Sequence, residues 1–282
     1  MYRNSVIAFS VILMAVVSFS CSKKNNGSLS VTPGTIAASS DLPAIIGRGE
    51  LTVGMDVSDI RYQPFEMKNA RGEIIGFDVE LAQMMADELG VSLEIVQTNW
   101  DGIIPALIDD KFDLIISGMS VTTERNKAIN FSEPYYLSGK SLLINTRNAG
   151  HIDTYRDLNR KSMVVATTFA DDMLLDRYFP DANIVRFEGD DEAVREVIAG
   201  RAHAYIADKA RVLLFSRKYQ ANTVAILEPF TFEPIAVGMR KGDVDLLNWI
   251  DNFIEIIKGD GRLATIERKW MQEYIPPSTG EK

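Results

Sequence analysis

Short apolar runs of strand length alternate with segments of helical periodicity along most of this chain, which restricts the folds open to it. Between residues 79 and 89 the apolar positions share one helical face, Asp78 is a candidate N-cap and Gly90 follows the last turn. The first set of predicted elements contains strands over 51–55, 93–97 and 113–117 and helices over 79–89 and 103–108. The second set contains strands over 162–167, 183–187 and 204–207, one helix that begins near residue 171 and another over 191–199. Such alternation predicts an α/β fold.

Two extended segments, 135–141 and 227–233, flank the second set. Pro134 and Pro229 restrict the neighbouring backbone toward extended conformations. Two such crossings predict two α/β lobes joined by a two-segment hinge. The predicted parts are a signal peptide over 1–20, a flexible tether over 21–45, lobe 1 over 46–137 and 232–282, and lobe 2 over 138–231. Ligand sites commonly lie between lobes, so the function is expected there.

The N-terminal segment predicts export. Arg3 is followed by a largely apolar run over 6–19, which has the length of a signal-peptide core and is short for a membrane span. Cys21 is the only cysteine, so a disulfide within the chain is impossible. We interpret Cys21 as a lipid-attachment residue, the alternative being an ordinary signal peptide with an incidental cysteine. Residues 22–40 are rich in Ser, Asn, Gly and Thr and predict a flexible tether to the membrane.

Composition excludes several classes of function. The formal net charge of −9 argues against a nucleic-acid surface, and beyond the leader no apolar run is long enough to span a bilayer. His151 and His203 are far apart and outside any metal-ligand spacing, so neither a metal site nor a cofactor is predicted. The hydrophobic content of 46% is sufficient for two lobes, and the chain is expected to be a monomer.

A carboxylate-binding pattern occurs in the segment 113–136. There an apolar strand runs into small polar residues and then a single arginine, Arg125. The arginine offers a planar fork of donors that matches a carboxylate, and small residues let a ligand approach the main chain. The small residues are Ser117, Gly118 and Ser120. The alternative is a strand, a loop and a surface salt bridge that contributes about 0 to 1 kcal/mol.

Several long motifs occur in order along the chain. They are QPFEM at 63–67, GEIIGFDVELAQMMADELG at 72–90, NWDGIIPALIDDKFDLIISGMSVTTERNKAINFSEPYY at 99–136 and GRAHAYIADKA at 200–210. With these motifs the chain resembles the bacterial family 3 solute-binding proteins of amino-acid ABC transporters, over about 50–275. The resemblance implies a two-lobed type II periplasmic-binding-protein-like fold. It also implies a receptor in the periplasm or on the cell surface, tethered by lipid at Cys21, which delivers an amino acid to an ABC transporter permease.

The same resemblance implies roles for individual residues. The predicted ligand-binding set is Asp59, Tyr62, Trp100, Ser117, Gly118, Ser120, Arg125, Thr168 and Asp208. Trp100 and Tyr62 match aromatic walls beside the ligand's side chain, and core packing is the alternative for both. The loop 117–120 matches groups that hold the α-ammonium and α-carboxylate, with Arg125 on the carboxylate. Asp208 matches the lobe 2 acid that pairs with the ammonium, and helix capping is its alternative.

Opposite charges on opposite lobes also imply a closing mechanism. An amino acid satisfies both charges only when the lobes approach, so its binding favours the closed state.

The chain departs from the family pattern in the second lobe. Residues 167–172 read TTFADD where a glycine followed by a small hydroxyl residue is usual. Thr168 remains a candidate donor, whereas Asp171 and Asp172 either stabilise a helix N-terminus or make this corner of the site acidic. Asp56 and Asp59 are either turn residues or contacts for the polar end of the ligand's side chain. The second role slightly favours a basic or polar amino acid as the ligand.

Two other functions remain open beside the non-enzymatic receptor. Some exported proteins of this fold are cyclohexadienyl dehydratases acting on prephenate or arogenate, and such an enzyme would need a general acid. Asp171, Glu188 and Asp208 are candidates for this acid, and no sequence feature selects one. The third function is a sensory module, which would need a separate signalling partner because the chain contains no output domain.

Overall fold

The computed structural model describes residues 40–58, 63–158, 163–167, 175 and 177–274. The predicted leader, most of the tether, the lipid-attachment residue Cys21 and the start of the helix predicted from residue 171 lie outside these ranges. So do the candidate ligand residues Asp59, Tyr62 and Thr168. Within the described ranges, no helix is both long and apolar enough to cross a membrane.

The predicted α/β fold is confirmed, and the first of its two five-stranded sheets has the order β4-β1-β5-β14-β6. Its strands are β1 (Glu50–Met55), β4 (Ser92–Gln97), β5 (Leu114–Ile115), β6 (Asn130–Phe131) and β14 (Gly238–Met239). Strands β4 and β5 run parallel to β1, whereas β14 is antiparallel to β5 and β6. The strand expected over 113–117 is shorter, since β5 contains only Leu114 and Ile115.

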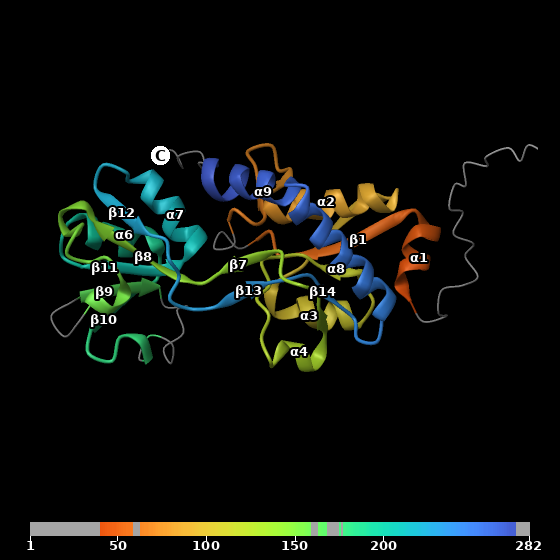
Figure 1. Ribbon diagram of the computed structural model, residues 1–282, viewed down its shortest axis with the longest axis horizontal. Helices are drawn as coiled ribbons and strands as arrows, with labels where there is room; N and C mark the ends of the chain where they lie inside the picture. The colour runs from red at the N-terminus through yellow and green to blue at the C-terminus, as the bar shows by residue number, and fades with distance from the viewer. Residues whose placement is uncertain (1–39, 59–62, 159–162, 168–174, 176, 275–282) are drawn as a thin grey trace, which may run out of the picture. The chain divides into compact units, whose positions relative to one another are not determined.

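The second sheet has the order β10-β9-β11-β8-β12 (Figure 1). Its strands are β8 (Lys140–Asn145), β9 (Met163–Thr167), β10 (Asn183–Phe187), β11 (Ala204–Asp208) and β12 (Thr223–Ile226). Strand β9 is parallel to β10 and β11, and β8 is antiparallel to β11 and β12. The accompanying helices are α6 (Asp190–Ile198), α7 (Lys209–Lys218) and the short η2 (Thr146–Asn148) and η3 (Tyr155–Asp157).

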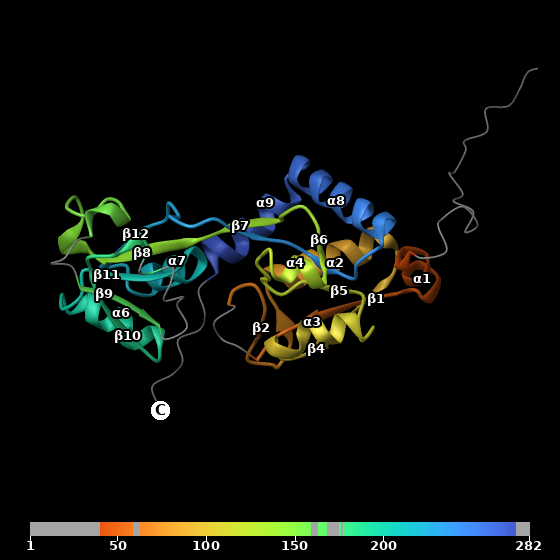
Figure 2. The same ribbon diagram turned by 90° about the horizontal axis from the view of Figure 1, so that it is seen from below.

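Helices cover both faces of the first sheet (Figure 2). Leu51, Val53 and Met55 of β1 pack in one core with α2 (Phe77–Leu89), α8 (Val244–Gly259) and α9 (Arg262–Glu267). A second core joins α3 (Trp100–Ile108) to Phe112 and Ile115. Further elements are the hairpin β2 (Met67–Lys68) and β3 (Ile74–Ile75), α4 (Arg125–Ala128) and η4 (Arg268–Glu273). Because side chains alternate along a strand, Leu51, Val53 and Met55 share one face of β1 and enter the first core together.

Two crossing segments pair with each other. Strand β7 (Tyr136–Ser138) is antiparallel to β13 (Glu233–Ile235) in a separate two-stranded sheet (Figure 1). The chain passes from β6 through β7 to β8, and from β12 through β13 to β14, so this ribbon carries both connections between the large sheets. The extended segments expected beside Pro134 and Pro229 thus contain these strands or lead into them, whereas the lobe limits at 137 and 231 remain predictions.

The expected N-cap of α2 is wrong. The helix begins at Phe77 after Gly76, and Asp78 lies inside the first turn with its carboxylate directed into the protein. Gly76 has a φ of 149°, and a Cβ there would lie 2.1 Å from the carbonyl oxygen of Phe65. Only glycine fits such a close approach at positive φ, so the backbone conformation fixes the start of the helix two residues earlier than the periodicity indicated.

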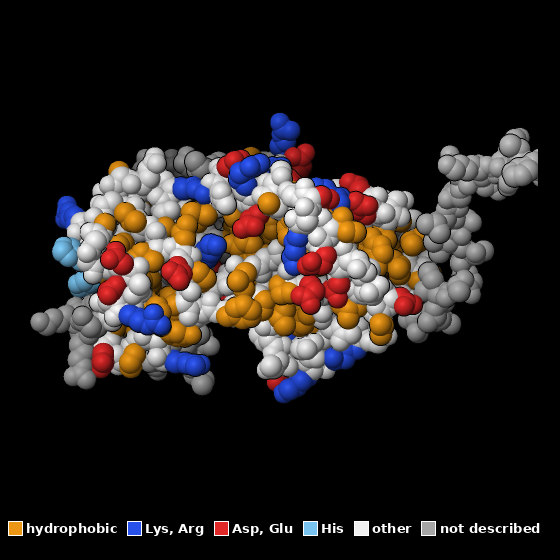
Figure 3. Space-filling view, viewed as in Figure 1, with side chains coloured by type: hydrophobic (Ala, Val, Ile, Leu, Met, Phe, Trp, Pro, Cys, Tyr) orange, Lys and Arg blue, Asp and Glu red, His pale blue; other side chains and the backbone are white. Residues whose placement is uncertain are grey.

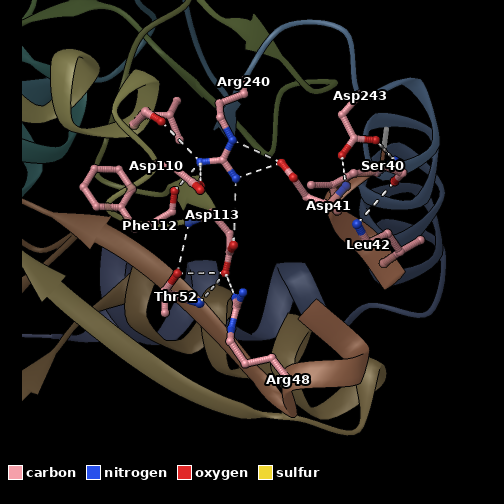
Figure 4. Close-up of polar contacts among 12 residues, drawn as sticks. Ser40, Asp41, Leu42, Arg48, Thr52, Asp110, Phe112, Asp113, Arg240 and Asp243 are labelled. Atoms are coloured by element: carbon pink, nitrogen blue, oxygen red, sulfur yellow. Dashed lines mark hydrogen bonds and ion pairs between the residues drawn. The ribbon is translucent and has the colours of Figure 1, made fainter. Parts of the chain in front are cut away.

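Helix α1 (Asp41–Arg48) is held on the first sheet by ionic contacts at both ends (Figure 4). The Arg240 guanidinium donates to Asp41 Oδ2 at 2.7 and 3.1 Å, and Arg48 Nη2 lies 2.5 Å from Asp113 Oδ2. The backbone amide of Asp41 also donates to Asp243, the N-cap of α8. The first element of the described chain is therefore firmly attached.

Candidate functional site

Arg125 is held in position at the first turn of α4. Its Nη1 donates to both the carbonyl oxygen and the hydroxyl of Ser120, each at 2.8 Å. Its guanidinium carbon lies 5.1 Å from the centre of the Trp100 ring, within the range of a cation–π contact. A guanidinium has five donors in a planar fork, so an arginine oriented this way is suited to a carboxylate. The structure thus brings together three of the predicted site residues.

Trp100 is positioned by a buried aspartate. Asp56 is 3% exposed, and its Oδ2 accepts from the backbone amide of Trp100 at 2.9 Å. Its Oδ1 accepts from the amide and hydroxyl of Ser58 at 3.0 and 2.6 Å. Helix α3 begins at Trp100, earlier than expected, because Asn99 caps it through the amide of Gly102. Asp56 is therefore a turn residue that also holds the backbone of Trp100.

Behind the loop 117–120 lies a buried polar network. The Ser117 hydroxyl accepts from the Asp56 amide at 3.0 Å and donates to Glu66 Oε1 at 2.5 Å. The Gly118 amide donates to Asp78 Oδ2 at 2.5 Å. Ser117 is fully buried, and its hydroxyl is engaged by Asp56 and Glu66. Gly118, with a φ of 54°, lets the chain turn toward Asp78.

Asp78 is the most unusual titratable group in this network. It is fully buried, and Tyr135 donates its hydroxyl to the same Oδ2 at 3.0 Å. Burial raises the pKa of Asp78 to about 7, against the opposing effect of the hydrogen bonds from Gly118 and Tyr135. Burial, together with the charges of Asp78 and Glu66, raises the pKa of Tyr135 well above 10. The loop therefore rests on an acid that titrates near neutral pH.

The same loop is joined to strand β13. Ser120 forms an isolated antiparallel bridge with Ile235, and the amide of Val121 donates to the carbonyl oxygen of Pro234 at 2.8 Å. The amide of Ala236 donates in turn to the carbonyl oxygen of Met119 at 3.2 Å. Since β13 is one half of the crossing ribbon, the segment that carries Ser120 and Arg125 is bonded directly to a connection between the sheets.

Asp208 belongs to the second sheet and has its own partner. It is the last residue of β11 and lies opposite Lys140 of β8 in antiparallel register. Asp208 is the N-cap residue of α7, but its side chain accepts no capping hydrogen bond from the helix. Instead Oδ1 contacts Lys140 Nζ, and the Asp208 side chain is 46% exposed. The Asp208 carboxylate is thus half-exposed and already in contact with an ammonium group.

Sequence reasoning missed four residues beside this candidate site. Glu66 and Asp78 lie within the motifs QPFEM and GEIIGFDVE, and each directly follows a phenylalanine. An acid next to an apolar aromatic residue was the available signal that its carboxylate is buried. Lys140 and Glu233 carried no signal, because Lys140 is 68 residues from Asp208 and 93 from Glu233.

Charges of both signs are interspersed on the face shown in Figure 3. Within the described part of the chain, no group of three or more His, Cys, Asp or Glu side chains is arranged to hold a metal ion.

The fold and site define a two-lobed α/β binding protein, and comparison with known proteins gives its class. Residues 51–273 match the bacterial extracellular solute-binding proteins, family 3. This chain belongs to that family. The predicted resemblance and the two-lobed type II fold are therefore confirmed.

Individual relatives agree with this assignment. The L-cystine-binding protein TcyJ of Escherichia coli K12 is 30% identical over 79% of this chain and 83% of its own length. A structure of the ancestral cationic amino acid solute-binding protein AncCDT-1 is 39% identical, with a TM-score of 0.74, and covers 83% of this chain and 100% of that one. A second structure of AncCDT-1 describes it as a precursor of cyclohexadienyl dehydratase.

A further solved structure contains a ligand. The putative ABC-transporter binding component of Wolinella succinogenes, complexed with lysine, is 39% identical and has a TM-score of 0.68. It covers 80% of this chain and 97% of that chain.

Proposed function

We propose that this protein is the extracytoplasmic receptor of an amino-acid ABC transporter and that it binds an α-amino acid between two closing lobes. The observation that carries the proposal is the Arg125 guanidinium, oriented by Ser120 and stacked near Trp100. In this assignment Arg125 binds the α-carboxylate and Asp208 the α-ammonium. Arg125 lies in α4, between two strands of the first sheet, and Asp208 ends a strand of the second sheet. A ligand that contacts both groups therefore stabilises the closed form by its differential contacts.

The ligand is proposed to be a cationic amino acid. AncCDT-1 is named for cationic amino acids and the Wolinella protein was solved with lysine, and both are 39% identical to this chain. Trp100 supports this choice, because the face of an indole attracts a cation. The predicted residues Asp59, Tyr62 and Thr168 complete the proposed site.

A thermal-shift screen of the purified protein against the amino acids, arogenate and prephenate tests the proposal. A ligand that binds only the folded state raises the melting temperature by mass action. We expect arginine, lysine or both to raise it. A protein unaffected by every amino acid would contradict the receptor assignment.

The screen also tests the enzymatic alternative, which the description of AncCDT-1 as a dehydratase precursor keeps open. Product formation from arogenate or prephenate, followed by chromatography, would establish the dehydratase. We expect no turnover. Elimination from arogenate needs a positioned general acid, and of the three candidates Asp208 is paired with Lys140 and Glu188 is exposed.

Cys21 is proposed to carry the lipid that anchors the receptor, which otherwise acts as a monomer. We expect Cys21→Ala to move the protein from the membrane fraction to the soluble fraction and to abolish incorporation of labelled palmitate. Ser28→Ala, a change of similar size in the tether segment, is the control and should stay in the membrane fraction. A Cys21→Ala protein that still sediments with membranes would show that another feature anchors it.

A further inference from the structure

Lys140 lies between two carboxylates from different parts of the chain. Its Nζ contacts Oδ1 of Asp208 and lies 3.3 Å from Oε2 of Glu233. The Lys140 side chain is 18% exposed. Burial lowers the pKa of Lys140, but the charges of Asp208 and Glu233 and the hydrogen bonds to them outweigh burial, so its pKa lies above 10.5. The Lys140 ammonium is therefore charged and shared between the two acids.

We propose that Lys140 is an internal counter-ion that competes with the ligand's α-ammonium for Asp208 and passes to Glu233 when the amino acid binds. This inference rests on the proposed function, in which Asp208 is the ligand's acid. A lysine side chain and an α-ammonium are the same kind of group, so both seek the same carboxylate, and two cations at one carboxylate repel each other. Glu233 provides the alternative partner within reach of the same Nζ.

The acceptor carboxylate is held ready by Thr231. The Thr231 hydroxyl donates to Oε1 of Glu233 at 2.8 Å and accepts from the backbone amide of Lys140 at 2.7 Å. These bonds turn Oε2 of Glu233 toward Lys140 and fix the spacing between the two chain segments. The transfer of Nζ from Asp208 to Glu233 therefore requires only side-chain rotation.

The transfer ends on the crossing ribbon. Glu233 lies opposite Ser138 of β7, and two residues later Ile235 bridges to Ser120, whose carbonyl and hydroxyl hold Arg125. The Lys140 ammonium, displaced from Asp208, thus moves to strand β13, which also supports the segment that holds Arg125. Occupation of Asp208 strengthens an ion pair at the hinge, which links ammonium binding to the crossing segments.

Isothermal titration calorimetry with L-arginine and L-lysine tests the proposal on the wild type, Lys140→Gln, Glu233→Gln and the double variant. We expect Lys140→Gln to bind about tenfold more tightly, because it removes the competitor, and Glu233→Gln to bind about tenfold more weakly, because the displaced lysine loses its acceptor. The double variant should bind like Lys140→Gln, since no lysine remains to be transferred.

Conservative and matched controls separate this role from a structural one. Lys140→Arg keeps the charge and should not bind more tightly than the wild type. Lys218 lies at the C-terminal end of α7, whereas Asp208 precedes the N-terminal end, and Lys218 pairs with Asp191. Lys218→Gln should therefore leave the affinity for the ligand unchanged. Thermal unfolding of each variant checks its folding.

The outcomes are distinct. If Lys140→Gln binds no more tightly than the wild type, or if Glu233→Gln weakens binding equally with and without Lys140, the inference is overturned although the receptor function stands. A folded wild-type protein that binds no amino acid overturns the proposed function itself, and the inference with it.

Discussion

Replacing Arg125 by alanine should lower the affinity for the amino acid by about one to two decades. A charge-assisted hydrogen bond contributes about 1.5 to 3 kcal/mol, and each 1.4 kcal/mol changes affinity about tenfold. Arg125→Lys should recover only part of this loss, because lysine keeps the charge but not the planar fork that matches a carboxylate. Titration calorimetry with the ligand identified in the thermal-shift screen measures both effects.

Arg156→Ala is the matched control for this prediction. Arg156 is also an arginine whose guanidinium lies over an aromatic ring, 4.8 Å from the centre of Tyr155, but it lies in η3, away from the predicted set. Its replacement should leave affinity within twofold, on the order of a surface contact. Equal affinities for Arg125→Ala and the wild type would remove Arg125 from the site.

The stability of the protein should fall as pH rises from about 5 to 8, and Asp78→Asn should reduce this fall. The pKa of Asp78 is about 7 in the folded state and 3.8 for an ordinary aspartate. Between these values the folded state holds a proton that the unfolded state has released, so raising the pH favours unfolding. One proton changes stability by about 1.4 kcal/mol per pH unit, which makes the expected loss roughly 3 kcal/mol by pH 8.

Urea unfolding at several pH values measures this difference. Asp87→Asn is the control, because Asp87 is an exposed acid on the same helix, and this variant should keep the wild-type pH dependence. Identical slopes for the wild type and Asp78→Asn would contradict an acid that titrates near neutral pH behind the loop 117–120.

The fold could be predicted largely because it depends on local patterns. Apolar spacing identified α2 and α6 to within two residues at each end, and the apolar runs identified β1, β4 and β10. The error at Asp78 had a long-range cause, since its partners Gly118 and Tyr135 are 40 and 57 residues away. An aspartate before a helical pattern reads as a cap unless such partners are known.

In the candidate site, too, contacts within one sequence motif could be predicted, whereas contacts between distant segments could not. Ser120 and Arg125 are five residues apart, so one continuous motif indicated that both belong to the same carboxylate-binding pattern. The sequence indicated Asp208 as the acid that pairs with the ligand's ammonium. It did not indicate the pairing of Asp208 with Lys140, because that pairing depends on the register of two antiparallel strands. The role of Asp56 in holding the amide of Trp100 across 44 residues was hidden for the same reason.

The attachment of α1 has a mechanical consequence. A force applied at the N-terminal end of α1 acts first on Asp41, which is bonded to Arg240 and to Asp243, the N-cap residue of α8. Farther along the helix, the fully buried Ile45 and the ion pair of Arg48 oppose the displacement of α1. All these contacts belong to the first sheet and its helices. A pull on this end of the described chain is thus taken up by the first sheet and its helices, and none of these contacts loads the ribbon of β7 and β13 directly.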